Sequence, residues 1–168
     1  MNFIELSKKR YSVLEYQEKQ VSDQLINKIL EAGIAAPTAC NFQPQKIKLI
    51  VSDEDKERLN HVVPSKYYVP AAILVCYDKS VCWTRSYDGK SSGEIDAAIV
   101  TTHMMLEATE LGLGSIWVMY WNPDVMRAEF NIPDQYEPVS LLIVGYPKEG
   151  VEPHKGHNQR KAVDDILF

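Results

Sequence analysis

Residues 92–120 read SGEIDAAIVTTHMMLEATELGLGSIWVMY, and this segment decides the fold. Between Ala97 and Leu106 it carries no formal charge if its histidine is neutral. A helix without a charged face is buried on most sides. We therefore predict a helix from about Ser92 to Gly112 that forms either the core or, the stronger explanation in so short a chain, a subunit interface. The glycines that follow end the helix, and the last residues, 115–120, predict a strand.

Outward from this segment, helices and strands follow one another without regular βαβ alternation, which favours a layered α+β fold over a doubly wound one. Capping residues and helical spacing predict four further helices, and apolar runs predict three further strands. The expected helices cover residues 2–9, 22–36, 54–62 (capped by Asp53) and 122–130 (capped by Asn122), and the expected strands cover residues 46–51, 71–77 and 139–145.

Length, composition and charge exclude several classes of protein. The 168 residues fit one domain, which we expect to span residues 1–168. With 45% hydrophobic and 24% charged residues the chain is neither disordered nor fibrous. Its net charge of −5 gives no global footprint for nucleic acid, and it has no apolar run long enough to span a membrane. The N-terminus MNFIELSKKR does not read as a secretory signal, and three cysteines without CxxC spacing suit a reducing cytoplasm.

Two segments contain side chains suited to a ligand. The basic corner Lys8-Lys9-Arg10-Tyr11-Ser12 offers a guanidinium and a hydroxyl for a phosphate, although a solvated helix C-terminus has the same composition. Residues 37–45, PTACNFQPQ, form an uncharged loop. The amides of Asn41 and Gln43 could pair with the edge of a heterocycle, with Pro37, Phe42 and Pro44 beside them, or could cap backbone groups in an ordinary turn.

The other polar groups give weaker signals. Glycine at position 114 would let a backbone N–H approach a ligand, but GLG follows a helix and is no dinucleotide fingerprint. Asp96 is interpreted as a partner of the helix dipole. In the basic tail, two histidines lack further metal ligands, so we expect no metal and favour a tail that folds back onto an anion. No nucleophile–base pair or carboxylate dyad is evident, which indicates that a cofactor carries the chemistry.

Taken in order, these pieces resemble the nitroreductase family of FMN-dependent oxidoreductases. The resemblance rests on Arg10-Tyr-Ser12 after a short helix, on Ala35-Ala-Pro-Thr-Ala-Cys-Asn-Phe-Gln-Pro44, on the helix from Asp96 with Leu111-Gly-Leu-Gly-Ser-Ile-Trp117, and on Val144-Gly-Tyr-Pro147 with the later Arg160. It covers nearly the whole chain. The sequence departs from the family pattern at residues 13–15, where relatives carry a basic residue, and at Gln45, where they often carry an aromatic one.

The resemblance implies a central, mostly antiparallel sheet flanked by helices, in a homodimer that holds two FMN molecules at the subunit interface. It places Arg10, Tyr11, Ser12 and Arg160 at the FMN phosphate and ribityl end. Residues Pro37, Thr38, Ala39, Asn41 and Gln43 would line the flavin, partly from the neighbouring subunit. The backbone of Gly114 and Ser115 would approach flavin N5, and Ile99, Met104, Met105 and Leu106 would form the dimer core. No side chain is expected to be catalytic.

The implied activity is electron transfer from NAD(P)H through flavin N5 to a nitroaromatic, a quinone or a similar small acceptor, by a ping-pong mechanism. The alternative is a non-enzymatic FMN-binding carrier or redox sensor on the same fold. Residues 78–92, which include Trp83, Arg85 and Tyr87, are the segment where we expect acceptor specificity to lie. The expected partners are a second copy of the chain, NAD(P)H and the acceptor.

Overall fold

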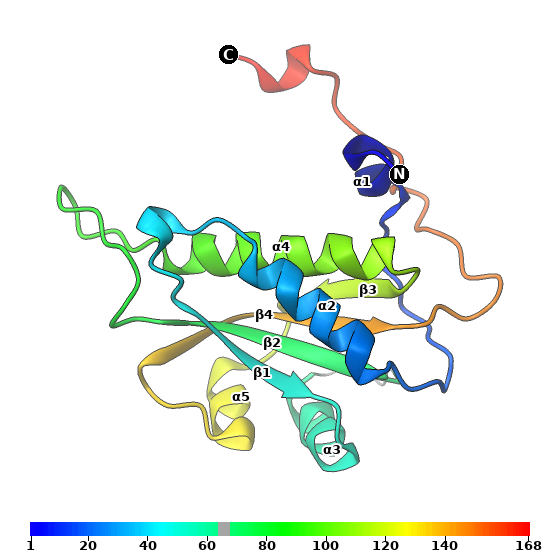
Figure 1. Ribbon diagram of the computed structural model, residues 1–168, viewed down its shortest axis with the longest axis horizontal. Coiled ribbons are helices and arrows are strands. Elements are labelled where there is room, and N and C mark those ends of the chain that lie inside the picture. The colour runs from blue at the N-terminus through cyan, green and yellow to red at the C-terminus, as the bar shows by residue number, and fades with distance from the viewer. Residues whose placement is uncertain (64–67) are drawn as a thin grey trace.

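A four-stranded antiparallel sheet in the order β1-β2-β4-β3 forms the centre of the computed structural model, which describes residues 1–63 and 68–168 (Figure 1). This agrees with the expected α+β class and the antiparallel sheet. Strand β2 is buried at every position because it lies inside the sheet and is covered on both faces. The strand bounds are β1 Gln45–Ile50, β2 Ala71–Asp78, β3 Gly114–Val118 and β4 Tyr136–Gly145.

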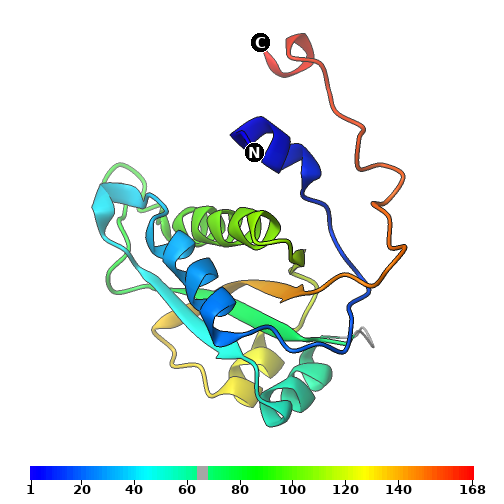
Figure 2. The same cartoon turned by 45° about the vertical axis from the view of Figure 1, so that its right-hand side comes forward.

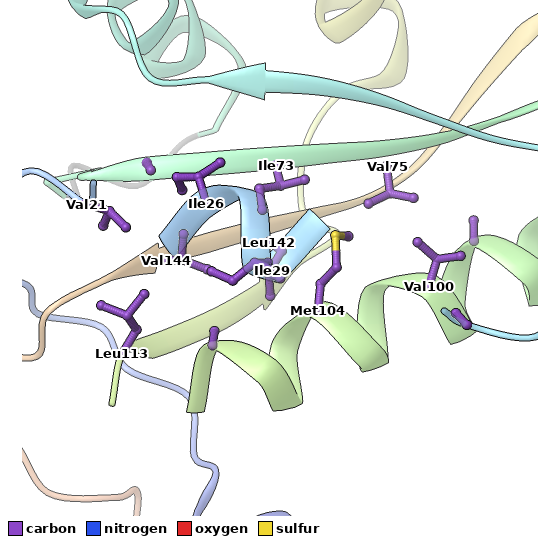
Figure 3. Packing of buried hydrophobic residues seen from close by; sticks show 14 residues of the cluster. Val21, Ile26, Ile29, Ile73, Val75, Val100, Met104, Leu113, Leu142 and Val144 are labelled. Atoms are coloured by element: carbon purple, nitrogen blue, oxygen red, sulfur yellow. The ribbon is translucent and has the colours of Figure 1, made fainter. Parts of the chain in front are cut away.

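Helices α2 (Asp23–Ile34) and α4 (Gly93–Glu110) cover one face of the sheet (Figures 1 and 3). Their inner side chains, among them Ile29, Val100 and Met104, are fully buried against Leu142 of β4. The two helices pack closely at Gly33, where a Cβ atom would lie 3.0 Å from Cγ of Met104. Fully buried side chains of this size each contribute about 1.5–3 kcal/mol to folding, so the uncharged stretch of α4 is partly explained by its own chain's core.

The other face of the sheet is covered by α3 (Asp53–Val62) and α5 (Pro123–Phe130). Leu59, Met126 and Phe130 pack there against Ile143. The prediction that Asn122 caps α5 is confirmed, because its side chain accepts hydrogen bonds from the first turn. The predicted cap of α3 was wrong by one residue: Ser52 accepts from the Asp55 N–H at 3.1 Å, and Asp53 already lies in the helix.

Both ends of the chain project from this body on the side of α4 (Figure 2). Helix α1 (Phe3–Lys9) begins with a capping box formed by Asn2 and Glu5 and ends at the predicted residue. The segment after β4 runs without strands to a short 3₁₀ helix, Asp164–Ile166. Several large apolar side chains on these two arms are exposed, namely Phe3, Ile4, Val163, Ile166, Leu167 and Phe168.

The predicted strand at residues 115–120 is shorter than expected, since β3 ends at Val118 and leaves Met119 and Tyr120 exposed. Residues 78–92 form an irregular segment with one bridge between Thr84 and Ser91. Within the described ranges, none of the helices has the length and apolarity needed to cross a lipid bilayer.

Candidate functional site

The N-terminal segment after α1 lies against the start of β3. Ser12 forms a parallel bridge with Ser115, and the Val13 N–H donates to the Ser115 carbonyl at 3.0 Å. This pairing brings together two sets of residues that the sequence only suggested separately, residues 10–12 and residues 114–115. Gly114 is required for the contact, because a Cβ there would lie 2.6 Å from Cγ2 of Val13.

The packing at Gly114 changes the interpretation of that glycine. A Cβ would also lie 2.9 Å from Cγ of Pro147, so the missing side chain is explained by two neighbouring segments of the chain itself. Gly112 has a different role, since its φ of +78° ends α4 in a Schellman motif, with Leu113 N–H donating to Ala108 at 2.8 Å. Close approach of a ligand is therefore not needed to account for either glycine.

A cavity of about 200 Å³ opens beside this junction at the C-terminal end of α4. Its lining combines cationic and apolar groups and includes Lys9, Arg10, Tyr11, Thr109, Gly112 and Pro147. The Arg10 side chain is half-buried, and burial, followed by the positive charge of Arg160, lowers the pKa of its guanidinium. Across residues 1–63 and 68–168, no carboxylate forms an ion pair with either arginine. Two neighbouring cations that lack a counterion are suited to binding an anion.

Hydrogen bonds between the two ends of the chain bring Arg160 toward Arg10. Gln17 N–H donates to the Tyr146 carbonyl at 2.8 Å, and the Tyr11 hydroxyl donates to the Val151 carbonyl at 3.2 Å. Further along, His157 Nε2 lies 2.9 Å from the Lys8 carbonyl, so it donates a hydrogen bond when it carries the proton. Among the residues that the structure describes, no three side chains of the metal-ligating types gather closely enough to hold a metal ion.

The uncharged loop adopts a strained backbone. Cys40, Asn41 and Gln43 have φ values of 52°, 55° and 51°, in the left-handed region that disfavours residues with a Cβ. Thr38 holds the loop closed, because its carbonyl accepts from Asn41 N–H at 3.0 Å and its hydroxyl accepts from Gln43 N–H at 3.1 Å. Strain of this kind, about 1–3 kcal/mol per residue, collects at ligand clamps and similar functional sites.

The side chains in the middle of this loop face outward, whereas Pro44 is buried. Asn41, Phe42 and Gln43 are exposed, and Gln43 Nε2 makes a long hydrogen bond of 3.3 Å to the Asn41 carbonyl. The backbone of the loop is therefore closed chiefly by Thr38, and of the two amides only that of Gln43 caps a backbone group. The amide of Asn41 stays available to a ligand.

The loop and the cationic cavity lie at opposite ends of α4. Asp96, in the first turn, accepts a hydrogen bond from the Ala39 N–H at 2.9 Å, whereas Thr109, in the last turn, lines the cavity. A helix rises about 1.5 Å per residue, so about 20 Å separates Asp96 from Thr109 along the axis. The predicted site residues therefore form two groups within one chain. Residues 114–115 lie near Arg10, whereas the uncharged loop lies at the other end of α4.

Between these two ends, the outer face of α4 is apolar and shallowly grooved. The groove, about 450 Å³, is lined by Glu94, Ile95, Ala98, Ile99, Thr102 and His103. Ile95 is 55% exposed there. The prediction that Met104 belongs to a dimer core was wrong, because this residue is fully buried in the core of its own chain, and Ile99 and Met105 are partly buried against the same core. The residues that face outward lie on one face of the helix, at the helical spacing of positions 95, 99 and 102.

Two buried polar atoms on β3 have no hydrogen-bond partner in the part of the chain that the structure describes: Ser115 Oγ and Trp117 Nε1. They lie two residues apart, so both face the same side of the sheet. That side is the one covered by α4, because the opposing residues Val144 and Leu142 belong to the core under that helix. Unpaired buried groups cost about 1–3 kcal/mol each, and a ligand or a second chain would provide partners.

Sequence reasoning missed a second hollow and the anchoring role of Asp96. The hollow, about 500 Å³, lies beyond the end of β3 and is lined by His61, Met119, Tyr120, Trp121 and Asn122. The exposure of Met119 and Tyr120 was not predicted, because the whole apolar run 115–120 resembles a strand. Asp96 is buried although it lies in the first turn of a helix, where a carboxylate is ordinarily solvated. No signal in the sequence distinguishes the two situations.

Comparisons with known proteins give a consistent result. The family model described as "Nitroreductase family" matches residues 7–80 and 67–146. A protein of Methanothermobacter thermautotrophicus named "Putative NADH dehydrogenase/NAD(P)H nitroreductase" is 30% identical over 161 residues, which cover 89% of this chain and 79% of that protein. An "NADPH-dependent oxidoreductase" of Staphylococcus haemolyticus is 27% identical, over 86% of this chain and 64% of its own length.

Solved structures agree with this match. A nitroreductase family protein from Clostridium difficile 630 is 45% identical, with a TM-score of 0.92 over 100% of this chain and 98% of that chain. A protein from Exiguobacterium sibiricum described as a "putative nitroreductase in complex with FMN" has a TM-score of 0.86 at 22% identity, over 100% of this chain and 97% of that chain. At that identity the second likeness concerns the fold alone.

Proposed function

Because the chain belongs to the nitroreductase family, we propose that it is an FMN-dependent oxidoreductase that takes electrons from NAD(P)H, built as one FMN-binding domain over residues 1–168. The single observation that carries the proposal is the cavity lined by Lys9 and Arg10, where Arg10 is close enough to Arg160 to be affected by its charge and neither arginine has a carboxylate partner in the described residues. A phosphate monoester is an anion that such a pair binds well, because guanidinium groups form charge-assisted hydrogen bonds with it.

The residues present fit FMN at both of its ends. Arg10, Tyr11, Ser12 and Arg160 would hold the phosphate and the ribityl chain. Pro37, Thr38, Ala39, Asn41 and Gln43 would hold the ring, with the amides at its pyrimidine edge and apolar groups at its faces. The backbone of Gly114 and Ser115 is proposed to approach flavin N5, while the absence of a side chain at Gly114 is already explained by packing within the chain.

We propose further that each site is shared between two copies of the chain. About 20 Å of α4 separates the cationic cavity from the uncharged loop, so one copy alone cannot offer both to one ligand side by side. A twofold dimer in which the outer faces of two α4 helices pack antiparallel would bring the loop of one copy to the cavity of the other. The apolar groove over Ile95, Ala98 and Ile99 supports this arrangement.

When bound, FMN supplies the electron chemistry: hydride from NAD(P)H is received at flavin N5, and the electrons leave for a nitroaromatic, a quinone or a similar small acceptor, in a ping-pong sequence. The residues of this chain bind and orient. The two arginines neutralise the phosphate, Asn41 donates and accepts at the ring edge, and Phe42 excludes water beside it. The ordered segment from Trp83 to Ser92 is proposed to contact the acceptor, because it lies next to α4 at the same end as the uncharged loop.

The purified protein with added FMN tests this function. We expect tight binding, measured by quenching of flavin fluorescence, followed by anaerobic bleaching of the flavin with NADH or NADPH and by steady turnover with menadione or a nitroaromatic. Comparing the two nicotinamides would establish the preferred donor. Tight binding without turnover would favour the FMN carrier or sensor, and a protein that takes up no FMN would overturn the proposal.

A further inference from the structure

The carboxylate of Asp96 is only 2% exposed and joins two segments that are distant in sequence. One oxygen, Oδ1, accepts a hydrogen bond from the Ala39 backbone N–H at 2.9 Å. The other, Oδ2, accepts from the Ser92 hydroxyl at 2.7 Å. Each oxygen thus serves a different part of the chain, which a helix-dipole partner in solvent would not do.

The first of these segments is the strained loop from Thr38 to Gln43. The hydrogen bonds that close this loop all lie inside it, between Thr38 or Ala39 and residues 41–43. The bond from Ala39 to Asp96 ties the loop to α4 from outside. Because residues in the left-handed region would relax if they were released, the position of the loop depends on this anchor.

The second segment is a small hairpin from Trp83 to Ser92, with Ser92 at its base. Ser92 N–H donates to the Trp83 carbonyl and Arg85 N–H to the Lys90 carbonyl, both at 2.9 Å. Arg85 also forms a two-pronged pair with Asp88, at 2.8 and 2.6 Å. Its tip carries Tyr87, which is 95% exposed. The hairpin is thus an ordered unit that projects from the body, and Ser92 is where it meets Asp96.

No lysine, arginine or histidine forms an ion pair with Asp96 in the ranges that the structure describes. Its two oxygens are held by the two donors, and it lies in the first turn of α4, where the helix dipole favours an acidic side chain. Removing the carboxylate would therefore leave the Ala39 N–H and the Ser92 hydroxyl without their acceptor. Neither segment would then be anchored to Asp96.

We propose that Asp96 is a positioning residue that holds the ring-binding loop and the hairpin at fixed places relative to each other. This inference rests on the proposed function, since it assigns the loop to the flavin and the hairpin to the acceptor. Asp96 touches neither ligand. Its effect is on the geometry between them, so that the acceptor meets the ring in one orientation.

Four variants of the full chain separate the two contacts. Asp96→Ala removes both, Ser92→Ala removes only the hairpin contact, and Asp96→Asn keeps an oxygen for Ala39 N–H and an amide that can donate to Ser92 Oγ. Asp53→Asn is the matched control, because it changes a fully exposed carboxylate in the first turn of α3. Each variant is measured with FMN saturated, for flavin reduction by NADPH, for kcat and KM toward menadione, and for the visible circular dichroism of the flavin. Amide hydrogen exchange is followed at residues 41–43 and 92–93 without FMN.

We expect Asp96→Ala to slow flavin reduction about ten- to a hundredfold, the scale of loss that a displacement of about 1 Å produces, and to alter the flavin dichroism. Asp96→Asn should restore most of the rate. Ser92→Ala should raise KM for menadione and leave flavin reduction nearly unchanged. Exchange should accelerate at residues 41–43 in Asp96→Ala, and at residues 92–93 in both Asp96→Ala and Ser92→Ala.

Equal rates and equal exchange in Asp96→Ala and in the control would overturn the inference, as would a fall in Asp96→Asn as large as that in Asp96→Ala. If Asp96→Ala does not fold, Ser92→Ala and Asp96→Asn decide, because each preserves a buried polar group at position 96. If the wild-type protein takes up no FMN, the proposed function is wrong. The positioning role of Asp96 is then judged on amide hydrogen exchange alone, and unchanged hydrogen exchange at residues 41–43 in Asp96→Ala would overturn it separately.

Discussion

The two ends of α4 prepare for a ligand by different physical means. At the C-terminal end, packing decides: Gly114 admits Val13 and Pro147, and the two ends of the chain bring Arg10 and Arg160 together without a counterion in the described residues. At the N-terminal end, hydrogen bonds decide: Thr38 and Asp96 hold a loop in a backbone conformation that its residues disfavour. The C-terminal end therefore contains two cations that repel each other, and a bound anion would reduce this repulsion. The N-terminal end contains a strained loop, and a ligand would bind to that preformed conformation.

The largest effect is expected from a variant that separates the two copies of the chain. Ile95→Glu places a charge on the outer face of α4, where the side chain is 55% exposed in the single chain. If each site needs both ends from two copies, the variant sediments as a monomer and its affinity for FMN falls more than about a hundredfold, or about 2.7 kcal/mol. Ile47→Glu, on the edge strand β1, is the control, with Ile47 37% exposed. A monomeric Ile95→Glu protein that binds FMN like the wild type would refute the shared site.

The next effect concerns the cationic end alone. Arg10→Ala removes one charge-assisted contact with the phosphate, and we expect a loss of about 1.5–3 kcal/mol, or roughly ten- to a hundredfold in FMN affinity. The remaining affinity should depend less on salt, because one fewer charge takes part. Fluorescence titration at two ionic strengths measures both. Arg58→Ala is the control, since Arg58 pairs with Glu54 on α3 at 2.6 Å. Unchanged affinity in Arg10→Ala would remove this residue from the site.

A smaller effect is expected at the other end. Asn41→Ala removes one neutral amide at the ring edge, and we expect a loss of about 0.5–1.5 kcal/mol in FMN affinity. Its salt dependence should equal that of the wild type, and the visible absorption maximum of the flavin should shift, because the contact is with the ring. A shift in Arg10→Ala and none in Asn41→Ala would reverse the assignment of the two ends.

The smallest effect concerns the stored strain. Cys40→Gly relieves a left-handed conformation but increases the freedom of the unfolded chain, so we expect the FMN-free protein to gain about 0.5–1 kcal/mol in free energy of unfolding. Urea denaturation measures the change. Asn131→Gly, at the left-handed C-cap of α5 (φ 49°), is the matched control outside the site, and it should gain less because asparagine tolerates this conformation. A loss of stability in Cys40→Gly would show that the loop is not strained there.

The sequence predicted most of the fold because its signals are local. Apolar periodicity, Asn2 and Asn122 as caps, and the glycine after α4 each describe a segment that folds as its own residues dictate. It also pointed to Arg10 and to the uncharged loop through the kinds of side chain present. It did not predict that these lie at opposite ends of α4, because that separation follows from the tertiary path of the chain. The burial of Asp96 and the reason for Gly114 were missed for the same cause: each depends on a neighbour that is far away in sequence.

The cavity around Arg10 is closed by residues from positions 9–13 and by a segment that follows β4, and Arg160 belongs to the same stretch of chain. During synthesis, the early residues emerge long before their partners. The sheet and its helices can assemble first, and the charge of Arg160 reaches Arg10 only after residue 160 has left the ribosome. If FMN binds as proposed, its phosphate would meet both arginines only after that point, so a nascent chain arrested earlier would have the sheet but would lack one of the two cations.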